Sequence, residues 1–374
     1  MSIFDRLVQL RQDLHRHPEL SHKESGTQQR ILNFLKAFPD GKLISLCAGK
    51  AMLICFDSRI PGPHRLFRAD LDALPIQEAP GRGYASEAKG ISHACGHDGH
   101  MAMVAALAHI WTNLPEKAGK LGLLFQHAEE LGEGALEVCR DPDFLTWAPT
   151  QVFGFHNIPG APLGHIIIGK DIFACASTGL RLLFKGESSH AAEPEKARSA
   201  LRVIPKLLEL AAELNSPVKD DRFFLATPVH VQIGHENFGI TPGDGRLCFT
   251  LRSQLDSVLL QGLSALRHHA EELAAHEQLA LKIEAVEPFP AVTIDADCTG
   301  LVETAARHAG LTVIKPAFPF LWSEDFGYFT QKYPGSYFGI GIGENRPGLH
   351  HPAYDFNDMV LEPAYKLFKE LLKL

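Results

Sequence analysis

The sequence predicts an α/β fold with a mainly parallel sheet and a second domain inserted into it. Apolar runs of strand length alternate with runs of helical periodicity through residues 1–174 and again through 289–374, which is the pattern of a parallel sheet covered by helices. Between them, residues 175–288 follow a different order of elements. Because 374 residues exceed one ordinary domain, we expect two compact units.

The composition excludes several classes of protein. The net charge is -8 and the acidic and basic residues are interspersed, so no basic surface for nucleic acid is predicted. No apolar stretch has the length of a membrane span. The seven cysteines are scattered and form no secreted disulfide framework. The first 20 residues show helical spacing instead of a signal-peptide core, and we therefore expect a cytoplasmic protein that binds neither nucleic acid nor membrane.

In the first part of the chain, polar side chains follow the ends of successive predicted strands. Parallel strands end at one edge of a sheet, and ligands bind at that edge. We therefore expect these side chains to meet, although each alone could be a cap, a core histidine or a solvated turn. In chain order they are Arg68, Asp70 and Asp72 in HRLFRADLDALP, His127, Glu129 and Glu130 after LGLLFQ, and His156 at the end of TQVFGFHN.

The octet HACGHDGH, residues 93–100, carries three histidines, a cysteine and an aspartate, which are side chains that bind zinc-like metals. The helical run MAMVAALAHIW follows at once, so Asp98 is expected at the N-cap. In an extended loop before that helix, Cys95 and His97 would point to the same side. The alternative interpretation is a histidine-rich helix cap with a buried thiol.

The inserted segment has the order of a ferredoxin-like unit. Its runs STGLRLLFKG, ARSALRVIPKLLELAAELN, TPVHVQIGHEN and GRLCFTLRS, a helix beginning near Ser257, and LALKIEAVE read βαββαβ. We expect residues 175–288 to form a lid or dimerisation domain. After Pro288 the chain returns to alternating helices and strands, and its last loop, LHHPAYDF, brings His350 and His351 within reach of the same sheet edge.

The residues collected at this edge predict a dinuclear metal site. The candidates Cys95, His97, Glu130, His156 and His350 are more ligands than a single tetrahedral zinc uses. Two metals can activate a water and polarise a carbonyl, while an unligated carboxylate moves the proton. From these residues alone, either Glu129 or Glu130 could be the ligand and the other the base.

Other readings of the same residues predict different chemistry. Cys95 could be the nucleophile of a cysteine amidase with a neighbouring histidine as its base, but such a mechanism does not need Glu130, His156 or His350. A third possibility is one structural metal in a non-catalytic binding protein. The run GHIIIGKD has the spacing of a phosphate-binding loop, but Asp171 stands where a hydroxyl residue is required, and we interpret it as a strand.

Eight motifs together resemble the dinuclear metallo-aminoacylase and carboxypeptidase superfamily, in its amidohydrolase branch with hippurate hydrolases, N-acyl-amino acid hydrolases and auxin-conjugate hydrolases. The motifs span nearly the whole chain and are LHRHPELSHKESGT, RADLDALP, HACGHDGH, QHAEE, FGFHN, GESSHAAEP, SEDFG and LHHPAYDF. The resemblance implies Glu129 as general acid and base and the first histidine of LHHP as a ligand. The implied ligands are Cys95, His97, Glu130, His156 and His350, with His350 preferred over His351.

The same resemblance implies two residues of the inserted domain. His190 in GESSHAAEP matches a histidine that stabilises the oxyanion, often across a dimer, and Arg252 matches an arginine that meets the substrate carboxylate. The chain departs from the family at two positions: His127 stands where proline is common, and Gly239 where asparagine is frequent. The second departure predicts that one contact from the lid to the substrate is missing.

We therefore expect an enzyme that hydrolyses the amide bond of N-acyl amino acids or related small conjugates, with a dipeptidase or metallocarboxypeptidase as the alternative. Two divalent ions per chain are expected, zinc or manganese first, with nickel and cobalt as alternatives. The resemblance implies a homodimer formed through the inserted domain. The sequence leaves open the acyl group, the amino acid, the metal, and whether His190 acts in its own chain or in the partner's.

Overall fold

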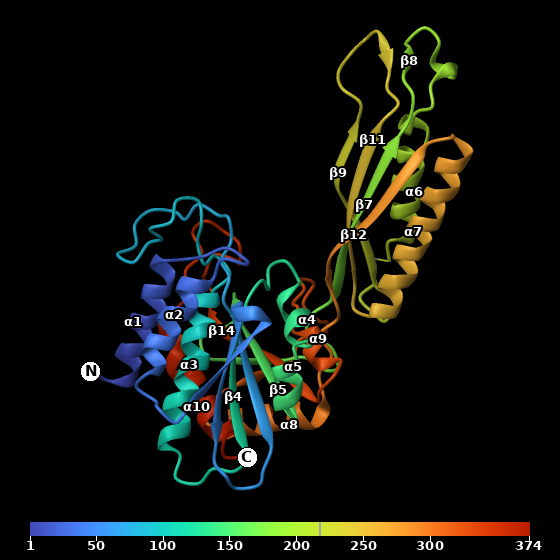
Figure 1. The fold of residues 1–374 in the computed structure, drawn as a ribbon. Coiled ribbons are helices and arrows are strands. Elements are labelled where there is room, and N and C mark those ends of the chain that lie inside the picture. The colour runs from blue at the N-terminus through green and yellow to red at the C-terminus, as the bar shows by residue number, and fades with distance from the viewer. Residues whose placement is uncertain (217) are drawn as a thin grey trace. The chain divides into compact units, whose positions relative to one another are not determined.

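The computed structural model describes residues 1–216 and 218–374 (Figure 1). The chain divides into two compact units: unit 1 comprises Met1–Phe173, Val292–Ala317 and Asp325–Leu374, and unit 2 comprises Ala174–Ala291 and Phe318–Glu324. The sequence analysis had placed residues 318–324 with the first unit, which the structure contradicts. They belong to unit 2 because Phe320 bridges to Ala174 and its carbonyl accepts the Cys175 N–H at 2.9 Å.

Unit 1 is organised around a mixed sheet of eight strands among the described residues, in the order β1-β2-β4-β3-β5-β14-β6-β13. The central strands β4, β3, β5 and β14 are parallel to one another. Strand β2 is antiparallel to β4, β1 is antiparallel to β2, and β6 is antiparallel to β14. The sheet is therefore mainly parallel, as predicted, and the last third of the chain rejoins it through β14. The strands are β1 Lys42–Leu46, β2 Ala51–Asp57, β3 His64–Asp70, β4 Lys120–Gln126, β5 Gln151–Pro159, β6 Ile166–Ile168, β13 Val313–Ile314 and β14 Gly335–Gly343.

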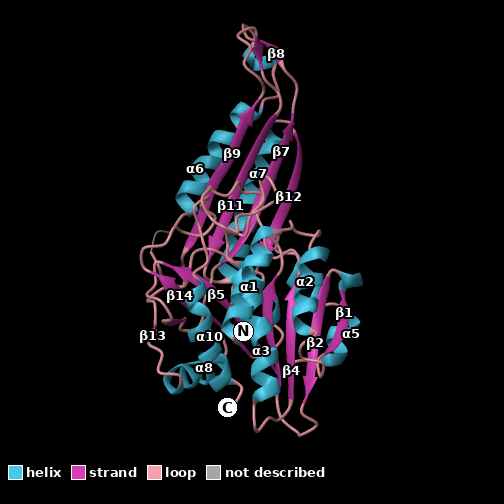
Figure 2. Ribbon diagram, turned by 90° about the vertical axis from the view of Figure 1, so that its left-hand side faces the viewer, coloured by secondary structure: helices cyan, strands magenta, loops and turns pink. Residues whose placement is uncertain are grey.

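Helices cover this sheet, and the central one is α3 (His97–Asn113), which packs on β3, β4 and β5 while α1 and α10 pack on it (Figure 2). Because α3 is enclosed on all sides, its sequence is apolar around its whole circumference. In the described part of the chain, no helix is long and apolar enough to cross a membrane. The remaining helices of unit 1 are α1 Ile3–Arg16, α2 Ser25–Leu35, η1 Cys47–Gly49, α4 Gly134–Val138, α5 Pro142–Trp147, α8 Ala296–His308, α9 Gly327–Thr330, η4 Asp358–Val360 and α10 Leu361–Leu371.

The predicted N-cap of α3 is wrong. The cap residue is Gly96, with φ 93°, and Asp98 already lies inside the helix. A side chain at position 96 would overlap the Tyr354 hydroxyl and the Asn157 amide, so only glycine fits this left-handed position. The Asp98 carboxylate instead pairs with His15 Nδ1 at 2.7 Å.

Unit 2 is an antiparallel sheet of strand order β12-β7-β11-β9 with two helices on one face (Figure 1). Strand β7 alternates buried and partly exposed residues, and Leu180, Leu182 and Phe184 form the buried row beneath α6 and α7. The chain order of these elements is β-α-β-β-α-β. The elements are β7 Ala176–Lys185, β8 Ser189–His190, η2 Pro194–Lys196, η3 Ala200–Arg202, α6 Ile204–Leu214, β9 Phe224–Ile233, β10 Ile240–Thr241, β11 Gly245–Ser253, α7 Asp256–His276 and β12 Ala280–Phe289.

Candidate metal centre

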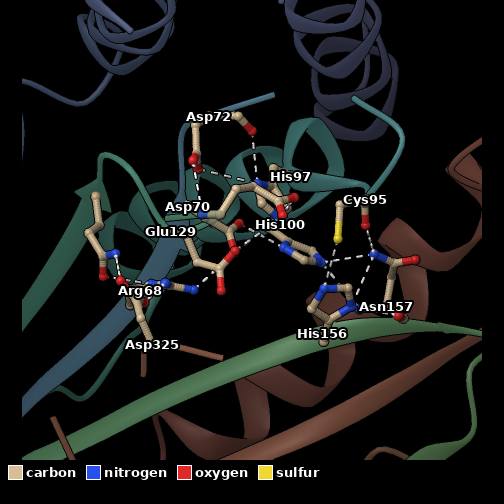
Figure 3. Close-up of polar contacts among 12 residues, drawn as sticks. Arg68, Asp70, Asp72, Cys95, His97, His100, Glu129, His156, Asn157 and Asp325 are labelled. Atoms are coloured by element: carbon tan, nitrogen blue, oxygen red, sulfur yellow. Dashed lines mark hydrogen bonds and ion pairs between the residues drawn. The ribbon is translucent and has the colours of Figure 1, made fainter. Parts of the chain in front are cut away.

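The carboxyl ends of β3, β4 and β5 and the first turn of α3 meet at one edge of the sheet in unit 1 (Figure 3). Of the overlapping groups of ligand atoms that converge there, three account for all the predicted ligands, and each has its atoms within 4.8 Å of one another. All five residues predicted as ligands, and also Glu129, are among them. The groups are Cys95 with His97 and His156, Cys95 with Glu130 and His350, and His97 with Glu129 and Glu130.

Two histidines are oriented by backbone carbonyls. His97 Nδ1 lies 2.8 Å from the carbonyl oxygen of Asp72, and His156 Nδ1 lies 2.8 Å from that of Asn157. A carbonyl only accepts, so each Nδ1 carries the proton and donates it. In the neutral imidazole each Nε2 then keeps its lone pair, and His156 Nε2 points at Cys95 Sγ, 3.4 Å away. This is the tautomer that a metal-binding histidine needs.

The two adjacent glutamates differ in their surroundings. Glu130 Oε1 lies 3.7 Å from both His97 Nε2 and His350 Nε2, whereas Glu129 Oε2 lies 4.0 Å from His97 Nε2. The backbone N–H of Glu130 donates to Asp72 at 3.0 Å. The Glu130 carboxylate thus stands between two imidazoles, while Glu129 stands beside them.

The last loop presents its two histidines differently. His350 is held by its N–H, which donates to the Ala94 carbonyl at 2.8 Å, and its Nε2 faces Glu130. His351 is exposed, as His350 also is, but its Nδ1 accepts the N–H of Ala353 at 3.0 Å. The geometry therefore favours His350 as the member of the cluster.

The Cys95 loop is supported by an amide and a phenol. Asn157 Nδ2 donates to the Cys95 carbonyl oxygen at 2.7 Å, and the Tyr354 hydroxyl donates to Asn157 Oδ1 at 2.7 Å. Tyr354 and Asn157 are both buried. This chain fixes the loop just before Gly96, where the backbone turns into α3.

A buried aspartate joins the histidines of α3. Asp70 lies 2.8 Å from His100 Nδ1 and 3.5 Å from His97 Nε2, and Arg68 donates to its other side at 2.9 Å. Burial would raise the pKa of Asp70, but the two imidazoles and the guanidinium outweigh it and hold the pKa well below its ordinary value. Asp325 completes the network as a second partner of Arg68.

Charge around the cysteine favours a bound cation. Burial and then the Glu130 carboxylate raise the pKa of the Cys95 thiol well above its ordinary value. Without a positive charge at the cluster, Cys95 would stay a thiol, and a thiol is a poor nucleophile. A divalent cation bound between the sulfur, imidazole and carboxylate atoms would offset the negative charge of Glu130 and of a Cys95 thiolate. These donors suit a zinc-like ion. The residues present therefore fit a metal.

A second buried network holds the first turn of α3 through Asp98. His15 lies between Asp98, at 2.7 Å from its Nδ1, and Glu78, at 3.0 Å from its Nε2, and Arg11 approaches Asp98 at 3.5 Å. Burial disfavours the charged imidazole, but the two carboxylates outweigh burial and raise the pKa of His15 to about 9. His15 is therefore protonated at neutral pH and holds the first turn of α3.

The other two predicted site residues lie in unit 2. Arg252, near the end of β11, donates from Nη1 to the Leu321 carbonyl at 2.7 Å and to Ser323 Oγ at 3.1 Å. His190, in the short strand β8, is exposed, and its Nδ1 accepts the N–H of Ala192 at 3.1 Å. Neither residue belongs to the cluster described within unit 1.

The sequence analysis assigned no role to four residues that orient this cluster. Asp70 and Asp72 were identified at the correct sheet edge, but their partners were not. Asn157 and Tyr354 stand inside the quoted motifs FGFHN and LHHPAYDF, which was the only signal for them. Their function depends on the fold, because Tyr354 and Asn157 are 197 positions apart.

Comparison with known proteins gives consistent matches along the chain. The family model for peptidase family M20/M25/M40 matches residues 66–374. An N-acetyl-L-cysteine deacetylase of Bacillus subtilis is 31% identical over 99% of this chain and 88% of the relative. An N-acetyldiaminopimelate deacetylase of the same organism is 29% identical over 96% of each chain.

The solved structures agree with these matches. The B. subtilis YXEP protein, described as a dinuclear metal-binding peptidase of the M20 family, has a TM-score of 0.82 and 26% identity, over 99% of this chain and 97% of that one. The aminohydrolase-like protein of methicillin-resistant Staphylococcus aureus has a TM-score of 0.86 at 23% identity, over 99% and 96% of the two chains, and this likeness shows the fold alone.

Proposed function

The chain belongs to peptidase family M20/M25/M40 and is a hydrolase, and from this premise we propose that it hydrolyses the amide bond of N-acyl amino acids or related small conjugates with two divalent metal ions. One observation carries the proposal: thiol, imidazole and carboxylate ligand atoms converge within 4.8 Å of one another beside a further carboxylate, Glu129. A cysteine amidase would need only Cys95 and one histidine, so it does not account for the other metal-ligand side chains of the cluster.

The substrate class rests on the relatives. Two of them are named as deacetylases of N-acetylcysteine and N-acetyldiaminopimelate, which are both N-acyl amino acids. The solved relative is described as a peptidase, so a dipeptide is the alternative substrate. In both cases the bond cleaved is an amide next to an amino acid.

We assign the metals to Cys95, His97, Glu130, His156 and His350. Glu130 faces the Nε2 atoms of two of these histidines at equal distances, which supports it as the ligand and Glu129 as the base. A thiolate with imidazoles favours zinc, and manganese is the second choice because carboxylates also suit it.

The proposed reaction uses water as the nucleophile. Ions bound here would lower the pKa of a water molecule and polarise the amide carbonyl. Glu129 takes a proton from the attacking water and transfers it to the departing amine nitrogen. Its carboxylate is nearly buried, at 6% exposure, so bulk solvent does not compete for the proton.

Arg252 is proposed to bind the substrate carboxylate. Its guanidinium is half-buried and one of its nitrogens is already held by Leu321 and Ser323, so it loses little side-chain entropy on binding an anion. A planar guanidinium matches a carboxylate with two parallel hydrogen bonds.

His190 is proposed to act in the partner subunit's site. Within unit 2, β8 lies beyond the Gly245 end of β11, while Arg252 is seven positions along that strand (Figure 1). At about 3.3 Å per residue, the two side chains stand roughly 20 Å apart. A small substrate cannot touch both from one chain.

The inserted domain, which we interpret as a ferredoxin-like lid, is proposed to form the homodimer. Its edge strand β9 exposes Val229 and Val231, at 59% and 48%, and Phe238 near β10 is 94% exposed. An exposed apolar edge strand invites pairing with another chain. Light scattering tests this, and a monomer at working concentration would remove the dimer and the action of His190 across it.

The decisive test of function is amine release from a panel of N-acetyl amino acids, N-benzoyl amino acids and dipeptides, using zinc- or manganese-loaded enzyme and a chelated control. Release that stops on chelation and returns with metal would support the proposal, and the best substrate would identify the acyl group. Release that persists after verified metal removal would favour the Cys95 nucleophile.

A mixing experiment tests His190. His190→Ala and Glu129→Gln chains, each inactive alone, are unfolded, mixed and refolded together. If His190 serves the partner's site, each mixed dimer contains one complete site, and about one quarter of wild-type activity returns. If it serves its own chain, mixing restores nothing.

A further inference from the structure

A second cluster of metal-ligand side chains lies in unit 1 outside the centre described above. Cys47, in the turn η1 between β1 and β2, meets His127, just after β4, and Glu137 of α4. One ligand atom from each lies within 4.8 Å of the other two. The three residues come from segments 80 and 10 positions apart in the chain, so the fold and not local sequence brings them together.

The histidine of this cluster is buried with an unused nitrogen. The His127 side chain has 0% exposure, and its Nε2 lies 3.0 Å from Glu137 Oε2. Its Nδ1, the ring nitrogen turned away from Glu137, has no hydrogen-bond partner among the described residues. Burial also lowers the pKa of His127, which leaves the imidazole neutral, the form that binds a metal.

Two carboxylates give the surroundings of Cys47 a negative charge. Burial, then the Asp141 and Glu137 carboxylates, raise the pKa of the Cys47 thiol to about 12. Asp141 itself is saturated, since it accepts the N–H groups of Cys47, Asp143 and Phe144. Among the described residues, the cation that contacts Glu137 is the Lys50 ammonium, at 2.7 Å, and the Lys50 side chain is 41% exposed. Lys50 can therefore swing into solvent and leave the carboxylate to another cation.

The distances among the three ligand atoms distinguish a metal site from a catalytic relay. In a catalytic relay the imidazole stands between thiol and carboxylate, so sulfur and carboxylate are held apart on opposite ring nitrogens. Here sulfur, nitrogen and oxygen each lie near both of the others. That convergent arrangement surrounds a single point, as the ligands of a metal ion do.

The geometry points to a further cation-binding site formed by Cys47, His127 and Glu137, with a zinc-like divalent ion as its ligand and one coordination position left for water. The ion would tie the turn η1, the end of β4 and helix α4 together, next to the segment that carries Glu129. On binding, the Cys47 thiol loses its proton to solvent and the Lys50 ammonium is displaced from Glu137. This site does not depend on the proposed function.

The test is the zinc content of folded full-length protein after equilibrium dialysis at neutral pH against micromolar free Zn²⁺. We expect Cys47→Ser to hold one ion fewer per chain than wild type, and Glu137→Gln to bind that ion at least tenfold more weakly. Cys55→Ser is the matched control, because Cys55 is also a half-buried cysteine and should change nothing. Equal zinc content in wild type and Cys47→Ser would overturn the site.

Two further measurements keep the proposal testable if a variant folds poorly. Lys50→Gln should bind the ion more tightly, because it removes the competing ammonium, and unchanged or weaker binding would contradict Glu137 as a ligand. In wild-type protein, Cd²⁺ should slow alkylation of Cys47 by iodoacetamide but not that of Cys55, read by peptide mass spectrometry. Equal slowing of both, or of neither, would exclude the site. These readouts do not use turnover, so they fail or succeed separately from the proposed activity.

Discussion

Replacing Tyr354 by phenylalanine removes one hydroxyl from the support of the Cys95 loop. That hydroxyl donates to Asn157 Oδ1 at 2.7 Å, and Asn157 Nδ2 in turn donates to the Cys95 carbonyl at 2.7 Å. Tyr354 has 2% exposure and Asn157 has 0%. The phenylalanine ring fills almost the same volume, so the variant tests the hydrogen bond and not the packing.

The size of the effect follows from burial. Leaving a buried acceptor without its donor costs about 1–3 kcal/mol, and we expect the free energy of unfolding of Tyr354→Phe to fall by this amount. Since Asn157 then holds the Cys95 carbonyl less firmly, the metal ligands lose part of their orientation. Removing such supporting contacts lowers metal affinity by roughly 10- to 100-fold.

Two assays separate these effects. Urea unfolding of the metal-free protein measures stability, and titration of the folded apoprotein with zinc measures affinity. The control is Tyr365→Phe, because the Tyr365 hydroxyl bonds to His109 Nδ1 at 2.9 Å on the partly exposed side of α10. If Tyr354→Phe matches this control in stability and in zinc affinity, the hydroxyl does not support the site.

Three other predictions concern Glu129 as the proposed base, Cys95, and the pH dependence of stability. Glu129→Gln should keep its metals but lose turnover by roughly 10²- to 10⁴-fold, measured as turnover against metal content, and near-normal turnover would remove Glu129 from the mechanism. Cys95→Ser should lose metal and activity together, whereas full metal in a dead enzyme would favour the nucleophile. The pKa of His15 is raised to about 9, so its contribution to stability is complete below pH 6.5 and disappears as pH rises through 9. Urea unfolding from pH 6 to 10 should therefore show a loss of up to about 3 kcal/mol that His15→Gln lacks, and parallel curves would contradict a charged His15.

Much of the fold of unit 1 could be predicted from local patterns. The strands HRLFRAD, LGLLFQ and TQVFGFHN are found where the periodicity placed them, and MAMVAALAHIW is helical as predicted, although α3 begins earlier, at His97, inside the octet. The start of α3 was predicted wrongly, because Asp98 has a good capping side chain but His15 binds it more effectively from another helix. The unit boundary at 318–324 was missed for a similar reason, since contacts with Ala174 and Arg252, both distant in sequence, assign that segment to unit 2.

For the candidate site, the sequence indicated the ligand types but not their partners. It placed Cys95, His97, Glu130, His156 and His350 at one edge by a topological argument, and the structure brings these residues together. Residue pattern alone could not separate Glu129 from Glu130, because adjacent residues of the same kind carry the same local signal, and their assignment came from the family resemblance. Their distances to His97 and His350 provide the difference.

The sequence by itself determined the chemistry available to this protein, because residue type and periodicity are properties of short stretches of chain. The tertiary structure alone decided that His97 Nδ1 faces the Asp72 carbonyl, why position 96 must be glycine, and that Cys47, His127 and Glu137 converge. These features depend on contacts between segments tens to hundreds of residues apart. Such contacts are specified by the packing of the whole unit, and no local pattern records them.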